Sequence, residues 1–150
     1  MRSGYTAARQ DGDRGFGLMG ARATVLAGGP ETTGAWEAIE LDLAPGARSP
    51  LHTLSADKLF YVATGTVTLV LDDETVTAEA GGFAQVPAGT PHCYRNDSAG
   101  PARMVVIVTG AGQVDFLRGM SALAAGGPPE PTAVAEHAGA HGVTILPPRA

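Results

Sequence analysis

The stretch GGFAQVPAGTPHCYRN, residues 81–96, decides the fold of this 150-residue chain. It holds Gly81, five residues, Pro87, one residue, Gly89, two residues, His92, three residues and Asn96. Glycines permit the backbone dihedrals of tight turns, and a proline within a sheet is confined to edges, strand starts and bulges. The stretch therefore predicts two short strands joined by a tight turn, with His92 on the second strand.

Short strand signals continue on both sides of this stretch. Residues 36–43 alternate between two faces, and residues 59–62 and 67–71 are β-rich runs separated by Thr64-Gly65, which is typical of a hairpin. Along the chain this pattern gives roughly eight to ten short strands at a spacing of about 8–12 residues. Such a series predicts a β-barrel or a β-sandwich.

A second segment adds a family resemblance. Gly46, His52 and Gly65 stand at the spacing of the first of two paired motifs of the cupin superfamily, and residues 81–96 match the second motif in full. In that family the first motif carries a second histidine and a glutamate, where this chain has Leu54 and Lys58. The chain thus resembles small bacterial monocupins of the quercetin-dioxygenase-like group, with a degenerate first motif.

This resemblance implies an all-β fold, the double-stranded β-barrel (jelly roll) of the cupins, with a short C-terminal helix. We expect a flexible N-terminal arm over residues 1–20 and the barrel over residues 21–112. Residues 113–150 are expected to form a helix and tail packed on the barrel, since apolar residues at 116, 117, 120 and 123 follow helical spacing. A weaker helix is expected at 132–140 and an edge strand at 143–146.

The same resemblance raises the question of a metal. In metal-binding cupins the four motif side chains hold Fe, Mn, Ni, Cu or Zn, but here only His52 and His92 stand at ligand positions. Leu54 has no donor atom, and a Lys58 ammonium about 4–5 Å from a dication would cost several kcal/mol. Asp57 is one residue out of register and should face away. We expect no cofactor; the alternative is a divalent transition metal on His52 and His92.

Three side chains are the candidate catalytic residues. His52 and His92 titrate near neutral pH as free side chains and could act as general acid and base. Lys58 could bind a carboxylate or stabilise an enolate. The alternatives are that the histidines are hydrogen-bonded remnants in a passive pocket and that Lys58 extends to the barrel mouth.

Other side chains are expected to contact a substrate because strand alternation could turn them inward. Simple packing of the barrel interior is the alternative for the aromatic ones. The candidates are Leu54, Phe60, Phe83, Gln85, Tyr94 and Glu37.

The predicted function is a metal-independent isomerase, cyclase or lyase that acts by acid–base chemistry on a hydrophobic, polyketide-like or aromatic metabolite in a biosynthetic pathway. One alternative is a metal-dependent, quercetinase-like dioxygenase, and another is a non-catalytic ligand-binding cupin. A homodimer is expected, because cupins of this kind commonly pair through sheet edges and exchanged terminal segments.

Composition excludes several partners. The net charge is −5 and basic residues do not cluster, which argues against nucleic acid. No apolar run approaches the roughly 20 residues of a membrane span, and the first ten residues lack the apolar stretch of a secretory signal. The single cysteine, Cys93, excludes an internal disulfide and suits a reducing compartment. We therefore expect a cytoplasmic protein with a small-molecule partner.

Overall fold

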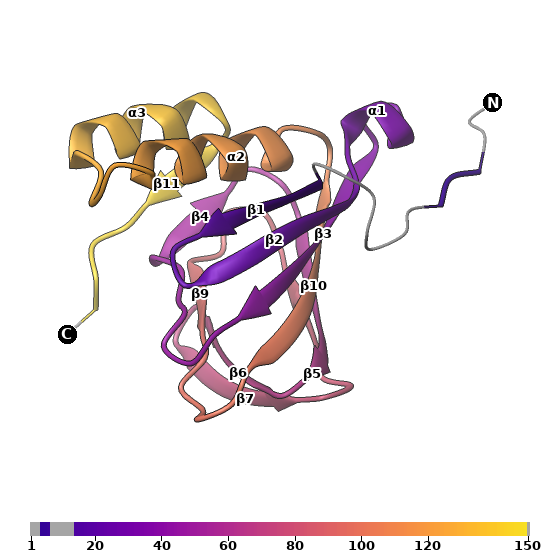
Figure 1. Cartoon of the computed structure of the whole chain (residues 1–150), viewed down its shortest axis with the longest axis vertical. Coiled ribbons are helices and arrows are strands. Elements are labelled where there is room, and N and C mark those ends of the chain that lie inside the picture. The colour runs from indigo at the N-terminus through magenta and orange to yellow at the C-terminus, as the bar shows by residue number, and fades with distance from the viewer. Residues whose placement is uncertain (1–3, 7–13, 150) are drawn as a thin grey trace.

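The computed structural model describes residues 4–6 and 14–149 of the chain. Their strands form two antiparallel sheets that face each other as a barrel (Figure 1). The six-stranded sheet has the order β1 (Gly15–Leu18), β2 (Ala21–Ala27), β3 (Trp36–Leu43), β10 (Ala102–Thr109), β5 (Lys58–Thr64) and β8 (Phe83–Val86). The five-stranded sheet has the order β11 (Val143–Ile145), β4 (His52–Leu54), β9 (His92–Arg95), β6 (Thr66–Leu71) and β7 (Glu74–Glu79). The all-β double-sheet fold expected from the sequence is confirmed.

The core lies between the two sheets, where alternate side chains of each strand point inward. Strand β10 shows the pattern most clearly, because Ala102, Met104, Val106 and Val108 are buried and the residues between them are half-buried. Across the core, strand β6 contributes Leu69 from the other sheet. This alternation is what aims side chains at the barrel interior.

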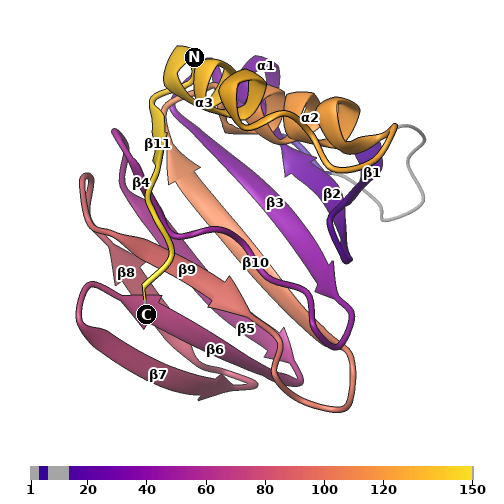
Figure 2. The same cartoon turned by 90° about the vertical axis from the view of Figure 1, so that its left-hand side faces the viewer.

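Two helices cover one end of the barrel, side by side (Figure 2). Helix α2 (Gln113–Ala124) buries Phe116 and Met120, and helix α3 (Pro131–Ala140) stacks His137 on the ring of Phe116. Both helices lie where the sequence predicts them, and β11 pairs with β4 as the expected edge strand. No helix in the described part of the chain is long and apolar enough to cross a membrane.

The N-terminal segment differs from the expected flexible arm. Residues 15–18 form strand β1, which pairs with β2 through a tight turn at Met19-Gly20, where both residues have positive φ. The sequence lacked a period there because the strand has only four residues, two of them glycines. Residues 1–3 and 7–13, the rest of the expected arm apart from 4–6, lie outside the described residues. A single helical turn, α1 (Gly29–Thr32), follows β2.

Two motif residues hold the barrel closed at the far end from the helices. The buried side chain of Asn96 donates hydrogen bonds to the carbonyl oxygens of Leu43 at 3.0 Å and Gly100 at 2.9 Å. Gly65 has a φ of 75°, and a Cβ there would lie 2.6 Å from the carbonyl oxygen of Pro101. Both positions therefore serve the fold, and the chemistry lies elsewhere in the motifs.

Candidate functional site

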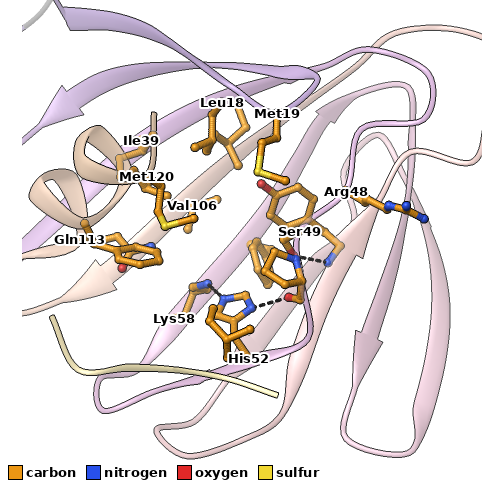
Figure 3. Close-up of a pocket in the computed structure, with 17 residues that line it drawn as sticks. Leu18, Met19, Ile39, Arg48, Ser49, His52, Lys58, Val106, Gln113 and Met120 are labelled. Carbon is orange, nitrogen blue, oxygen red and sulfur yellow. Dashed lines mark hydrogen bonds between the residues drawn. The ribbon is translucent and has the colours of Figure 1, made fainter. Parts of the chain in front are cut away.

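The centre of the candidate site is a lysine held between two histidines. Lys58 begins β5 in one sheet, whereas His52 and His92 are paired neighbours on β4 and β9 of the other. The Nζ atom of Lys58 lies 3.2 Å from Nε2 of His52 and 2.9 Å from Nε2 of His92. All three side chains are buried. Figure 3 shows Lys58 and His52 pointing toward one another.

Backbone carbonyls fix which ring nitrogen of each histidine carries the proton. Nδ1 of His52 lies 2.7 Å from the carbonyl oxygen of Pro50, and Nδ1 of His92 lies 2.8 Å from that of Thr90. A carbonyl oxygen only accepts hydrogen bonds, so both Nδ1 atoms are assigned as N–H donors. Both Nε2 atoms therefore present lone pairs, and Lys58 donates to each of them.

Burial changes the protonation of all three groups. Burial, with the charge of Lys58 as the second cause, lowers the pKa of His52 to about 2 and that of His92 to about 4. Burial also lowers the pKa of Lys58 to about 7, although its hydrogen bonds to two neutral acceptors favour the ammonium. The expectation that the histidines titrate near neutral pH is therefore wrong, because the group that titrates there is Lys58.

The residues present do not fit a resident metal ion. A zinc or similar ion would need to lie about 2.0–2.1 Å from the imidazole nitrogens, and Nζ of Lys58 already uses the Nε2 lone pairs of both histidines. Leu54 offers no donor, and Asp57 is exposed, with Oδ1 accepting from the Ala88 amide at 2.9 Å. Across residues 4–6 and 14–149, no cluster of three or more His, Cys, Asp or Glu side chains is placed to hold a metal.

The site opens into a cavity of about 60 Å³ between the sheets and helix α2. Its lining is mostly apolar, and the exposed residues Met19 and Arg48 mark the end nearest solvent. Tyr94 is the buried phenol of the lining, and burial raises its pKa to about 12, which keeps it protonated. The other principal lining residues are Leu18, Ile39, Leu41, His52, Lys58, Phe60, Val106, Gln113, Phe116, Leu117, Met120 and Ile145 (Figure 3).

Some of the side chains expected at the site are there and others stand behind it. Phe60 and Tyr94 line the cavity with His52 and Lys58. His92 has no exposed surface and does not line the cavity. It is linked to the cavity by its hydrogen bond with Lys58, which does line it. Leu54 shares the inward face of β4 with His52 but packs into the core, away from the cavity.

Phe83 and Gln85 were placed on the wrong face of their strand. The register pairs Lys58 with Val86 and Phe60 with Ala84, and directly opposed residues of an antiparallel pair share a face. Because Lys58 and Phe60 point inward, Phe83 and Gln85 point outward and are exposed. Strand alternation separates the two faces of this four-residue strand, but it does not say which face points into the barrel.

Glu37 also lies outside the cavity. It shares a strand face with the lining residues Ile39 and Leu41. It lies at the start of β3, however, and does not line the cavity. Its buried carboxylate accepts hydrogen bonds from the backbone amides of Gly29 at 2.9 Å and Val114 at 3.0 Å. The side chain therefore ties the starts of α1 and α2 to the barrel.

Several lining residues carry no sequence signal that would place them at the site. Phe116, Leu117 and Met120 were recognised as the apolar face of a helix, but sequence alone does not say that this face closes the barrel. Met19 lies at the turn of a hairpin that was expected to be a flexible arm. Gln113 gave no signal, since it is a lone polar residue at the start of α2.

Comparison with known proteins agrees with this architecture. A family model described as "Cupin domain" matches residues 39–108. Quercetin 2,3-dioxygenase from Bacillus subtilis is 38% identical over 77 residues, which are 51% of this chain and 23% of that protein. The chain thus spans less than a quarter of this curated relative.

Two solved structures are similar to this chain. Protein TT1209 from Thermus thermophilus is 31% identical, with a TM-score of 0.50 over 51% of this chain and 74% of that one. A sugar phosphate isomerase of the cupin superfamily from Silicibacter pomeroyi is 26% identical, with a TM-score of 0.56 over 63% of this chain and 62% of that one. Fold, motif spacing and relatives agree, and the chain belongs to the cupin superfamily.

Proposed function

We propose that this chain is a metal-independent enzyme that transfers protons on a small, mostly apolar substrate, with Lys58 as the group that takes and returns the proton. The observation that carries the proposal is the position of Nζ between two neutral Nε2 acceptors, at the inner end of an apolar cavity. The reaction class is isomerisation, cyclisation or elimination, none of which needs a redox centre.

Lys58 suits this role because its amine and ammonium forms lie close in free energy near neutral pH. The amine accepts a proton from a carbon next to a carbonyl group, and the resulting ammonium donates hydrogen bonds to His52 and His92. The same proton then returns to another atom of the substrate. His92 acts here as a positioning residue, because it touches Lys58 and not the cavity.

The developing enolate oxygen needs a donor, and the cavity offers one in Tyr94. Its phenol stays protonated at neutral pH because burial raises its pKa to about 12. Gln113 adds an amide donor on the helix side of the same cavity. Donors held in a water-poor site stabilise such charge more strongly than they would in water.

The cavity size constrains the substrate. Pockets for drug-sized ligands typically measure about 300–1,000 Å³, whereas this one measures about 60 Å³. The volume favours a compound smaller than the polyketide-like substrate expected from the sequence. Met19 and Met120 line the cavity, and such unbranched side chains adapt readily to a larger guest.

The proposal is tested by hydrogen exchange at carbon. Chelator-treated protein is incubated in D₂O with small ketones such as cyclohexanone and acetophenone, and deuterium at the α carbon is followed by NMR. We expect catalysed exchange in the parent and in Gln85→Ala, an exposed control, and its loss in Lys58→Met. Exchange that persists in Lys58→Met would refute the proposal, and binding without exchange would favour a ligand-binding protein.

A second candidate is a metal-dependent dioxygenase, which the 38% identity to quercetin 2,3-dioxygenase supports. The presence of Leu54 and Lys58 opposes it, because they remove two of the four family ligands. Metal analysis of untagged protein distinguishes the two candidates. One tightly bound transition metal per chain would favour the dioxygenase.

A further inference from the structure

Lys58 is the single lysine of the chain, which otherwise carries its side-chain cations on nine arginines. It is also almost entirely buried, with 3% of its surface exposed. Among the described residues no carboxylate forms an ion pair with it. Nζ of Lys58, the one primary amine among the side chains, thus lies at the inner end of an apolar cavity.

Hydrogen bonding sets the direction in which this amine can react. A neutral lysine has two N–H bonds and one lone pair in a tetrahedral arrangement. Both N–H bonds have acceptors, namely Nε2 of His52 and Nε2 of His92. The lone pair must then point away from both rings. Because Lys58 lines the cavity and His92 does not, this direction leads into the cavity. Burial in apolar surroundings is one of the recognised ways to activate a lysine amine as a nucleophile.

We propose that Lys58 forms a Schiff base with a small, mostly apolar aldehyde or ketone. This inference rests on the proposed function and keeps its reaction class, but it makes Lys58 the nucleophile and passes the α proton to His52. Nζ bonds to the carbonyl carbon as the carbonyl π electrons move to oxygen. The two protons that Nζ loses leave with that oxygen as water, giving an imine. One proton from solvent converts the imine into an iminium ion.

The two histidines then separate in function. An iminium nitrogen carries one N–H, which can donate to His92 behind the lysine. The Nε2 atom of His52 is freed, and His52 lines the cavity where the substrate α carbon would lie. With a pKa of about 2, His52 is a weak base, and it can accept the α proton because the adjacent iminium acidifies that proton. A site with one buried amine and two fixed acceptors therefore meets the needs of both steps.

A neutral carbonyl compound also suits the cavity better than an anion. The lining is mostly apolar, and its other cation, Arg48, stands at the exposed end. A carboxylate or phosphate at the inner end would lose its hydration with Lys58 as its one cationic partner, which is costly. An aldehyde or ketone carries no such desolvation cost.

The experiment traps the bond by reduction. The full chain is incubated with benzaldehyde and sodium cyanoborohydride, and benzyl groups are located by mass spectrometry of peptides. Since Lys58 is the single lysine, the N-terminal amine is the one other primary amine and serves as an internal reference. We expect Lys58 to be modified faster than the N-terminus in folded protein, and to lose that advantage after unfolding in guanidinium. His52→Gln should slow the trapping at Lys58.

Modification confined to the N-terminal amine in folded protein would overturn the inference, and so would equal rates at Lys58 in folded and unfolded chains. Failure here and failure of the proposed function are distinguishable. If Lys58 is not trapped but ketone exchange still requires it, the Schiff base is refuted and simple proton transfer stands. If Lys58 is trapped but no ketone exchanges its α protons, proton transfer is refuted and the covalent step stands.

Discussion

Nζ of Lys58 lies 2.9 Å from Nε2 of His92, a hydrogen bond that joins the first residue of β5 to the first residue of β9 across the two sheets. His92 is locked from behind by the carbonyl oxygen of Thr90. The contact puts a cation donor where other members of the superfamily place a ligand carboxylate. It makes the site dependent on the protonation of one buried amine.

The first prediction concerns stability and pH. The pKa of Lys58 is about 7 in the folded chain and 10.5 as a free side chain. Between these values the unfolded chain binds a proton that the folded chain does not, so stability rises with pH. From pH 7 to 9 this contribution amounts to roughly 2–3 kcal/mol.

Urea unfolding of the parent and of Lys58→Met at pH 7, 8 and 9 measures the contribution as a difference. His52 and His92 face Lys58, and Tyr94 and Arg48 line the same cavity. The pKa values of the two histidines and Tyr94 lie outside pH 7–9. Equal pH slopes for the two proteins would mean that Lys58 stays charged in the fold.

The second prediction concerns His92 as a positioning residue. His92→Leu removes one acceptor of the ammonium, which should lower the pKa of Lys58 further and shift the pH profile of ketone exchange to lower pH. His92→Gln keeps an acceptor oxygen and should restore the parent profile in part. A reduced rate with an unchanged profile in both variants would assign His92 a purely structural role.

The third prediction concerns His52, which lines the cavity. His52→Ala should fold, because the ring is near the end of a three-residue strand, and should lose about 10²-fold or more in α-proton exchange. Circular dichroism checks the fold and NMR in D₂O checks the exchange. Full activity of this variant would leave Lys58 to act with His92 alone.

The overall fold was predictable because it depends on features with fixed spacing. Gly81, Pro87, Gly89 and Asn96 set turns and a barrel corner, and each does so with its own backbone or a short side chain. The identity of the three central residues was predictable for the same reason, since motif spacing places His52, Lys58 and His92 on facing strands.

What escaped prediction depends on register and on distant packing. The inward face of β8 follows from its pairing with β5, which the residues of β8 do not encode by themselves. Glu37 follows strand alternation correctly, yet its partners are the amides of Gly29 and Val114, the second of them 77 residues away. The pKa values of His52, Lys58 and His92 depend on burial, and therefore on helix α2 closing the barrel.

The fourth prediction concerns that Glu37 anchor. Glu37→Leu leaves two backbone amides at the starts of α1 and α2 without their partner, and should lower the free energy of unfolding by about 1–3 kcal/mol. Glu74→Leu, at an exposed position of β7, is the matched control. Equal stability of the two variants would show that water replaces the carboxylate at no cost.

The last prediction restores the family ligand set. Leu54 shares the inward strand face with His52, and Lys58 stands where the family has its glutamate. The double variant Leu54→His, Lys58→Glu would supply three imidazoles and one carboxylate, a set that binds divalent transition metals, and would remove the amine that now uses both Nε2 lone pairs. We expect about one zinc or manganese ion per chain by mass spectrometry of dialysed protein, and a rise in Tm on adding metal. Leu54→His alone is the control and should bind metal weakly, because Lys58 still uses both Nε2 lone pairs. Tight binding by the parent would show that Lys58 moves aside for a metal, and the assignment of a metal-independent site would then be wrong.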